Sequence, residues 1–138
     1  MSDISIDSVL SNADRSKLEA IIADRETAGR FYAEHSGVYR AFLKMEHAAF
    51  SDGALPRDQK ELIAIGISIV DNCESCLEWH IKQALEAGAT PDTIIEAIGV
   101  GIEMGGGPAT VSARFAMKAL AYHTQSSPLD SQSQTQAG

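Results

Sequence analysis

The fold is decided by residues 60–80, which read KELIAIGISIVDNCESCLEWH. The first half is a mostly apolar run from Leu62 to Val70, and the second half carries two cysteines and a histidine. The apolar run is only about half the roughly 20 residues that span a bilayer, and it includes Gly66 and Ser68. These residues therefore predict a buried helix of a water-soluble domain, followed by a polar, chemically reactive segment.

The whole chain is expected to form one all-helical domain. Its 138 residues are enough to bury a core without disulfide bonds. No sustained alternation of apolar and polar residues indicates a strand, whereas Ala, Leu, Glu, Lys and Ile recur at spacings of three and four. We expect a helical domain over residues 1–122 with its core in residues 56–120, and a polar, disordered tail over residues 123–138.

Charge excludes two classes of partner. The formal net charge is -8, from 19 acidic and 11 basic residues, and no three basic residues stand together. Such a surface repels phosphate backbones and anionic lipids, so neither nucleic acid nor a membrane is an expected partner. The first ten residues carry acids where a secretion signal has bases. We therefore expect a cytoplasmic protein.

Six helices are expected, separated by capping and breaking residues. The first is expected to start near residue 12, and the second to run from about 29 to 50, where Gly37 allows a break. The others are expected at about 56 to 70, 73 to 87, 91 to 105 and 108 to 122. The second should bury a stripe that includes Phe31, Val38, Phe42 and Met45, and the third should be buried on nearly every side. Asp71 and Asn72 are expected to cap the helix that begins at the cysteines. Small residues at positions 66, 68, 99, 101 and 105 predict that helices approach closely there.

The two cysteines and the histidine form the chemical centre of the sequence. Cys73, Cys76 and His80 are spaced by three and four residues, so a helix places all three on one face. The cysteines occupy the first turn, where the helix dipole stabilises a thiolate by roughly 0.3–1 kcal/mol, and by up to about 2 kcal/mol when partly buried, too little to lower a thiol pKa by several units. His80, one turn further on, can accept the thiol proton. In a reducing compartment, such a pair points to redox chemistry or metal binding.

A histidine base usually needs a carboxylate to orient it, and Glu61 is the candidate. If the chain reverses at Asp71 and Asn72, Glu61 lies about 16 Å and His80 about 13 Å from the turn, at roughly 1.5 Å per residue. The two side chains would then lie almost level. Other charged residues are expected to be unremarkable: Glu74, Glu78, His35, His47 and His123 are interpreted as solvated, and Trp79 as a packing residue.

Metal binding is the alternative reading of the same residues. Two thiolates with His80 and Glu61 could form a four-coordinate zinc site. The sequence has no second C-x-x-C or H-x-x-H pair to support it, so redox chemistry without a metal is preferred.

These motifs resemble the AhpD-like alkylhydroperoxidase and carboxymuconolactone decarboxylase superfamily. The resemblance rests on KELIA at 60–64, on Cys73-x-x-Cys76-x-x-x-His80 and on ALEAGAT at 84–90, and it covers about residues 56–120. The twelve residues from Glu61 to Cys73 agree with the peroxidase branch, whereas the decarboxylase branch generally lacks the cysteine pair. The chain departs from the peroxidases at Ser75, where they can carry a second histidine.

The resemblance implies an all-α homo-oligomer, a trimer or hexamer, that reduces organic hydroperoxides without haem, flavin or metal. It further implies that Cys76 attacks the peroxide, Cys73 resolves the product, and Glu61 with His80 relays protons. An external dithiol, lipoyl or thioredoxin-like, would restore the thiols. The alternatives are a non-peroxidase thiol-disulfide oxidoreductase or redox sensor, and a decarboxylase-like enzyme that merely retains the cysteines.

Overall fold

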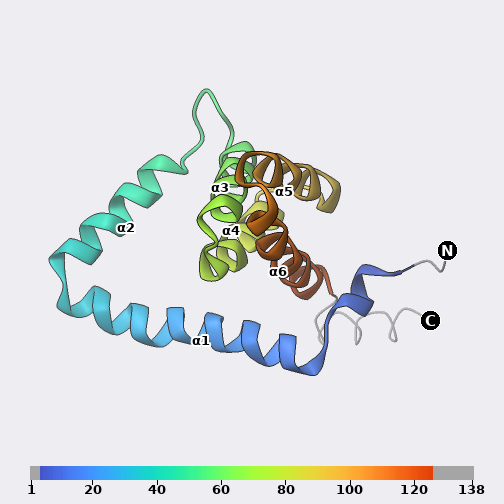
Figure 1. The fold of residues 1–138 in the computed structure, drawn as a ribbon. Helices are drawn as coiled ribbons and strands as arrows, with labels where there is room; N and C mark the ends of the chain where they lie inside the picture. Colours follow the sequence, from blue (N-terminus) through green and yellow to red (C-terminus); the bar gives the residue numbers. More distant parts are fainter. Residues whose placement is uncertain (1–3, 126–138) are drawn as a thin grey trace, which may run out of the picture.

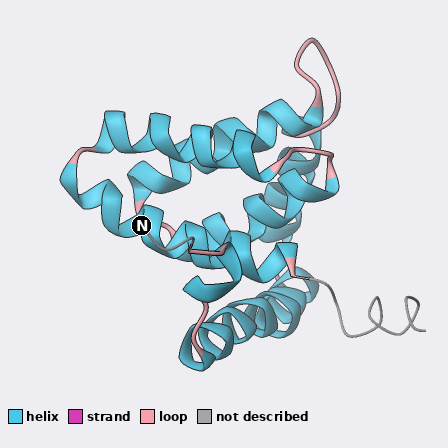
Figure 2. Cartoon of the chain, turned by 90° about the vertical axis from the view of Figure 1, so that its right-hand side faces the viewer, coloured by secondary structure: helices cyan, strands magenta, loops and turns pink. Residues whose placement is uncertain are grey.

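The computed structural model describes residues 4–125, which form an all-α domain (Figures 1 and 2). The elements are a short 3-10 helix at Ile6–Val9, α1 (Asn12–His35), α2 (Gly37–Ala49), α3 (Arg57–Asp71), α4 (Glu74–Glu86), α5 (Pro91–Gly105) and α6 (Gly107–Thr124). Residues 4–125 contain no strand, which confirms the predicted fold class. The last helix includes His123 and Thr124 and so runs slightly past its predicted end, while residues 126–138 of the expected tail lie outside the described residues.

Helices α3 to α6 pack together as a bundle that contains most of the core (Figure 1). Helix α3 lies against both α4 and α5, and α6 lies against α4 and α5. Small residues allow these approaches, as expected. A Cβ on Gly101 of α5 would come within 2.7 Å of Ile69 Cβ and 2.8 Å of the Gly66 carbonyl oxygen, both on α3.

Side-chain caps set most helix starts. Ser11 and Asp14 form a capping box at α1, and Thr90 and Thr93 form one at α5, which begins with Pro91. The start of α4 differs from the prediction. Its cap is Cys73 itself, because Asn72 has a left-handed φ of 54° and closes the end of α3 instead.

Helices α1 and α2 form an arm at the side of the bundle, and we call residues 12–49 the arm (Figure 1). Helix α1 contacts α4 and α6 and buries Leu18 in the core, whereas α2 lies further out. The first break falls at Ser36 and not before Gly29, because the Ser36 hydroxyl caps α2 while α1 continues to His35. The expected buried stripe is wrong: Phe31, Val38 and Met45 are 64%, 79% and 62% exposed. Within residues 4–125, the backbone of α2 comes close to no helix but α1, so Val38 and Met45 of α2 have no bundle helix packed over them.

The central helix α3 is also less buried than expected. Ile65 and Ile69 are fully buried, but Ile63, Ile67 and Val70 are about half exposed. With Val100 and Met104 of α5 they leave an apolar face on the outside of the bundle. No helix of the described range is long and apolar enough to cross a membrane.

Candidate functional site

The hairpin between α3 and α4 brings Glu61 and His80 together. The left-handed Asn72 reverses the chain, and Glu61 Oε2 lies 2.7 Å from His80 Nδ1. Glu61 is 2% exposed, and no described residue leaves a buried side-chain nitrogen or oxygen without a hydrogen-bond partner. This contact agrees with the expectation from helix geometry that the two side chains lie level.

The contact determines which histidine nitrogen is available for chemistry. Beside a carboxylate, Nδ1 carries the proton and donates it in the hydrogen bond, so Nε2 keeps its lone pair. The Phe50 ring stacks on the His80 ring with centroids 5.2 Å apart, and Arg57 Nε lies 3.9 Å from the second Glu61 oxygen. The imidazole is therefore held in one orientation, with one nitrogen free to exchange a proton.

The cysteine pair occupies the first turn of α4, as the spacing predicted. Cys73 and Cys76 form a disulfide, with their Cα atoms 5.2 Å apart. Cys73 is the N-cap residue, and the backbone N–H of Cys76 donates to Cys73 Sγ over 3.2 Å. Both sulfurs thus lie where unpaired backbone N–H groups favour negative charge.

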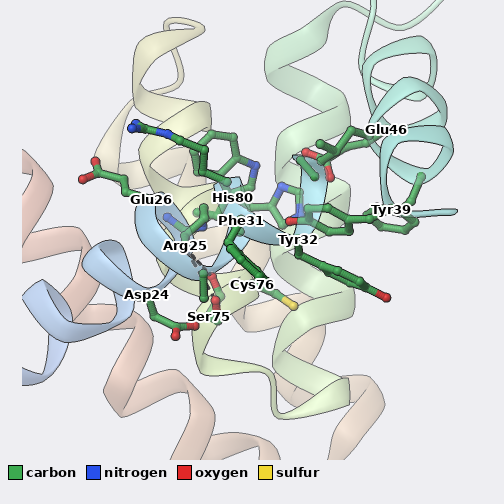
Figure 3. Close-up of a pocket in the computed structure, with 17 residues that line it drawn as sticks. Asp24, Arg25, Glu26, Phe31, Tyr32, Tyr39, Glu46, Ser75, Cys76 and His80 are labelled. Carbon is green, nitrogen blue, oxygen red and sulfur yellow. Dashed lines mark hydrogen bonds between the residues drawn. The ribbon is translucent and has the colours of Figure 1, made fainter. Parts of the chain in front are cut away.

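Cys76 and His80 line an open pocket of about 970 Å³ between the arm and α4, whereas Cys73 does not line it (Figure 3). The arm contributes apolar and aromatic walls, which are Phe31, Tyr32, Tyr39, Phe42 and Leu43. Figure 3 shows the Cys76 sulfur directed to the same side as the arm's tyrosines. Of the two cysteines, Cys76 is therefore the one a ligand in this pocket can reach.

A second polar cluster on α4 was missed by sequence reasoning. Glu78, expected to be solvated, is fully buried, and its Oε1 accepts a hydrogen bond from Arg25 Nη1 at 2.7 Å. His123, expected to be an isolated surface residue, lies with Nε2 3.3 Å from Glu78 Oε2. Glu78 falls on the face of α4 that turns toward α1 and α6, and spacing along α4 alone could not reveal either partner.

These partners explain the acidity of Glu78. Burial by itself raises the pKa of this carboxyl, but hydrogen bonds from His123 and Arg25 lower it more, so its pKa lies below the ordinary value. Glu78 is therefore ionised at neutral pH in spite of its burial. The other expected solvated acid, Glu74, is partly exposed and pairs with Lys17 at 2.6 Å.

Nothing in residues 4–125 gathers three or more His, Cys, Asp or Glu side chains as metal ligands would be gathered. The catalytic roles assigned to Cys76, Cys73, His80 and Glu61 stay predictions, although the four residues lie on one hairpin.

Comparison with known proteins gives relatives over most of the chain. An uncharacterised protein of Cupriavidus necator is 44% identical over 82 residues, which cover 59% of this chain and 70% of that protein. Uncharacterized protein 4 in the cox locus of Paracoccus denitrificans is 36% identical over 104 residues, covering 75% of this chain and 88% of that protein.

Solved structures share the fold. A carboxymuconolactone decarboxylase family protein from Legionella pneumophila superposes with a TM-score of 0.73 at 30% identity, covering 79% of this chain and 98% of that one. A protein of the same family from Thermotoga maritima, for which an antioxidative role has been raised, gives a TM-score of 0.69 at 20% identity, covering 86% and 97% of the two chains.

The match to a family model extends from residue 36 to residue 119, and so takes in α2, the hairpin with the cysteine pair, α5 and the first two thirds of α6. Together with this fold and these relatives, it shows that the chain belongs to the carboxymuconolactone decarboxylase family, which includes the AhpD-like proteins.

Proposed function

We propose that this protein is a thiol-dependent peroxidase that reduces organic hydroperoxides through Cys76 and Cys73. The observation that carries the proposal is the combination of a closed Cys73–Cys76 pair with the buried Glu61–His80 hydrogen bond on the same hairpin. A thiol with a histidine base that is itself oriented by a carboxylate is the arrangement used to activate nucleophiles.

In the first step, His80 Nε2 takes the Cys76 thiol proton, directly or through water, and Glu61 stabilises the resulting imidazolium. The thiolate attacks the terminal oxygen of the hydroperoxide, and the O–O bond breaks. The sulfur is oxidised to a sulfenic acid, and the peroxide is reduced to an alcohol, which receives its proton from His80.

In the second step, the Cys73 sulfur attacks the Cys76 sulfenic acid, the S–S bond forms, and hydroxide leaves as water after protonation. The i, i+3 spacing lets this bond form within one helical turn. An external dithiol, lipoyl or thioredoxin-like, then reduces the disulfide by exchange and is itself oxidised to a disulfide. Electrons thus flow from the dithiol to the hydroperoxide with no further cofactor in the proposed cycle.

The test is quenched-flow measurement of organic hydroperoxide consumption by the reduced full-length protein. One equivalent of alcohol per chain should form in a rapid single turnover, and added dithiol should make the reaction catalytic. Cys76→Ser should consume no peroxide. Cys73→Ser should complete the first step and stop at the sulfenic acid, which a dimedone-type reagent would trap.

The result also separates the alternatives. Exchange with dithiols and disulfides without peroxide consumption would identify a thiol-disulfide oxidoreductase or redox sensor and overturn the peroxidase proposal. Activity on a lactone that survives Cys76→Ser would point to a decarboxylase-like enzyme.

A further inference from the structure

Arg25 of α1 connects the arm to α4, the helix that begins at the cysteine pair, and no step of the proposed reaction uses Arg25. Its Nη2 donates to the Ser75 carbonyl oxygen at 3.2 Å and reaches the Ser75 hydroxyl at 3.5 Å (Figure 3). Its Nη1 pairs with Glu78, and its guanidinium lies 4.9 Å from the centre of the Trp79 ring. One side chain of α1 therefore contacts three residues of α4 that surround Cys76 in the sequence.

Of the Arg25–Glu78 ion pair, only the positive partner lines the pocket. Arg25 lines the pocket together with Ser75, Cys76 and His80, and a quarter of its side chain is exposed. Glu78 does not line the pocket and is fully buried, with His123 on its far oxygen. The positive end of the pair thus faces the side on which Cys76 is accessible, and the negative end lies behind it.

We propose that Arg25 is a positioning residue of the redox site, which fixes the first turn of α4 through Ser75 and holds a positive charge on the pocket side of Cys76, where it favours the thiolate. The inference rests on the proposed thiol chemistry. It adds a contribution that the helix N-terminus and His80 do not provide, because a full charge held nearby acts on the thiolate by direct Coulomb attraction.

Other charged groups line the pocket or border the start of α4, and none of them changes in the Arg25 and Glu78 variants compared below. These are Asp24, Glu26 and Arg30 of α1, Glu46 of α2, His80 with Glu61 behind it, and the Lys17–Glu74 pair at the start of α4.

The experiment measures the pKa of the Cys76 thiol in the full-length protein, with Cys73→Ser so that a single thiol titrates. The pH dependence of iodoacetamide alkylation and of thiolate absorbance both report it. Arg25→Gln should raise the Cys76 pKa and Glu78→Gln should lower it, each by roughly half a unit to one unit, as expected for one charge near a partly exposed group. Arg25→Lys should restore much of the effect, and the double variant should return close to the starting value.

The opposite signs distinguish this role from simple support of the fold. Breaking the pair from either side loosens the arm, so a purely structural role would move the Cys76 pKa in the same direction in both single variants. Lys17→Gln is the matched control, since it removes another α1–α4 ion pair, which is about half exposed and does not line the pocket. It should leave the pKa nearly unchanged.

Shifts of equal sign, or no shift in an Arg25→Gln protein that keeps its helical circular dichroism, would overturn the inference. If Arg25→Gln does not fold because Glu78 is left buried without its cation, the double variant compared with Glu78→Gln still decides the question, because loss of Arg25 in that background should raise the Cys76 pKa by the same amount. Thiol titration requires no peroxide turnover. If the wild-type protein does not reduce hydroperoxides but the two variants shift the Cys76 pKa in opposite directions, the peroxidase proposal fails and the role of Arg25 stands. If the wild-type protein reduces hydroperoxides but the variants show no opposite shifts, the peroxidase proposal stands and the role of Arg25 fails.

Discussion

At the scale of single residues, Glu61 and His80 form a unit because each provides the hydrogen-bond partner that the other needs in a buried position. The carboxylate is 2% exposed and accepts the His80 Nδ1 proton, and stacking on Phe50 limits rotation of the ring. A buried carboxylate without such a donor would be expensive to ionise. The His80 tautomer that leaves Nε2 without a proton therefore depends on Glu61.

We expect Glu61→Gln and His80→Ala each to slow peroxide reduction by roughly 10²- to 10⁴-fold, the usual scale for loss of positioned acid–base help. The double variant should be little slower than the worse single variant, because either change already breaks the relay. Raising the pH should partly rescue all three, since hydroxide then forms the thiolate. Stopped-flow rates of peroxide reduction, measured across pH, check this. Glu74→Gln is the control, because it removes a carboxylate from α4, the helix of His80, without touching the Glu61–His80 contact. An unaltered rate and pH profile in folded Glu61→Gln would leave Glu61 a structural acid only.

Asp14 provides a pH-dependent contribution at the start of α1. The Ser11 backbone N–H, then Lys118 and the Ser11 hydroxyl, lower the pKa of Asp14 to about 2 from an ordinary 3.8. A lowered folded-state pKa stabilises the fold above the ordinary value, and this stabilisation is lost as the pH falls toward the folded-state pKa. Asp14→Asn should thus lower the urea midpoint at neutral pH, with the difference from wild type shrinking as the pH falls from about 4 toward 2. A difference independent of pH would contradict the ionic origin.

At the scale of helices, the disulfide joins two neighbouring positions at the start of α4. Cys73 caps the helix and Cys76 stands one turn on, so we expect opening of the disulfide to leave the hydrogen bonds of α4 in place. The redox state of the protein can therefore change with little change of fold.

Mild peroxide treatment should convert two free thiols per chain to none, with little change in helical circular dichroism. Mass analysis after alkylation counts the thiols, and non-reducing electrophoresis shows whether chains are joined. Mainly intermolecular disulfides would mean that the two sulfurs do not share one face of α4 in solution.

The contact between α3 and α5 depends on the absence of a side chain at position 101. Gly101→Ala would place a methyl group 2.7 Å from Ile69 Cβ and 2.8 Å from a backbone oxygen. We expect it to lower the free energy of unfolding by about 1–3 kcal/mol, as for other overpacked sites. Gly99→Ala on the same helix meets nothing within 4 Å and should be neutral or stabilising by up to about 1 kcal/mol. Urea unfolding compares the two, and equal stabilities would disprove the close approach.

At the scale of the molecule, two surfaces of this chain carry apolar side chains. One is the arm, where α2 has no buried residue, and the other is the outer face of α3 and α5. Isolated helices of this length are marginal in water, so such surfaces are typical of chains that associate. We propose that the protein is a homo-oligomer, a trimer or hexamer.

Light scattering at micromolar concentration should give a mass that is a multiple of the 14.7 kDa chain. Ile67→Glu, on the half-exposed face of α3, should reduce that mass while helical circular dichroism is kept. Glu96→Gln, an exposed change on α5, should leave the mass unaltered. A strictly monomeric wild-type protein would rule the proposal out.

The sequence by itself determined the fold class, the hairpin at residues 60–80 and the position of the cysteine pair at the start of its second helix, with His80 one turn further on. These are local consequences of apolar periodicity, caps and a spacing of three and four, and they need no knowledge of distant contacts. The Glu61–His80 pairing could be expected as well, since only one turn separates the two helices and the rise per residue fixes their register.

Only the tertiary structure decided which apolar stripes find a partner and which charges are buried. Periodicity marks a face of α2 as apolar but does not say whether a core lies opposite, and the arm leaves Phe31, Val38 and Met45 exposed. Glu78 meets Arg25 and His123 across separations of 53 and 45 residues, and such contacts depend on how α1 and α6 pack on α4. Burial is a property of the assembled fold, and for that reason only the tertiary structure reveals the second polar cluster on α4.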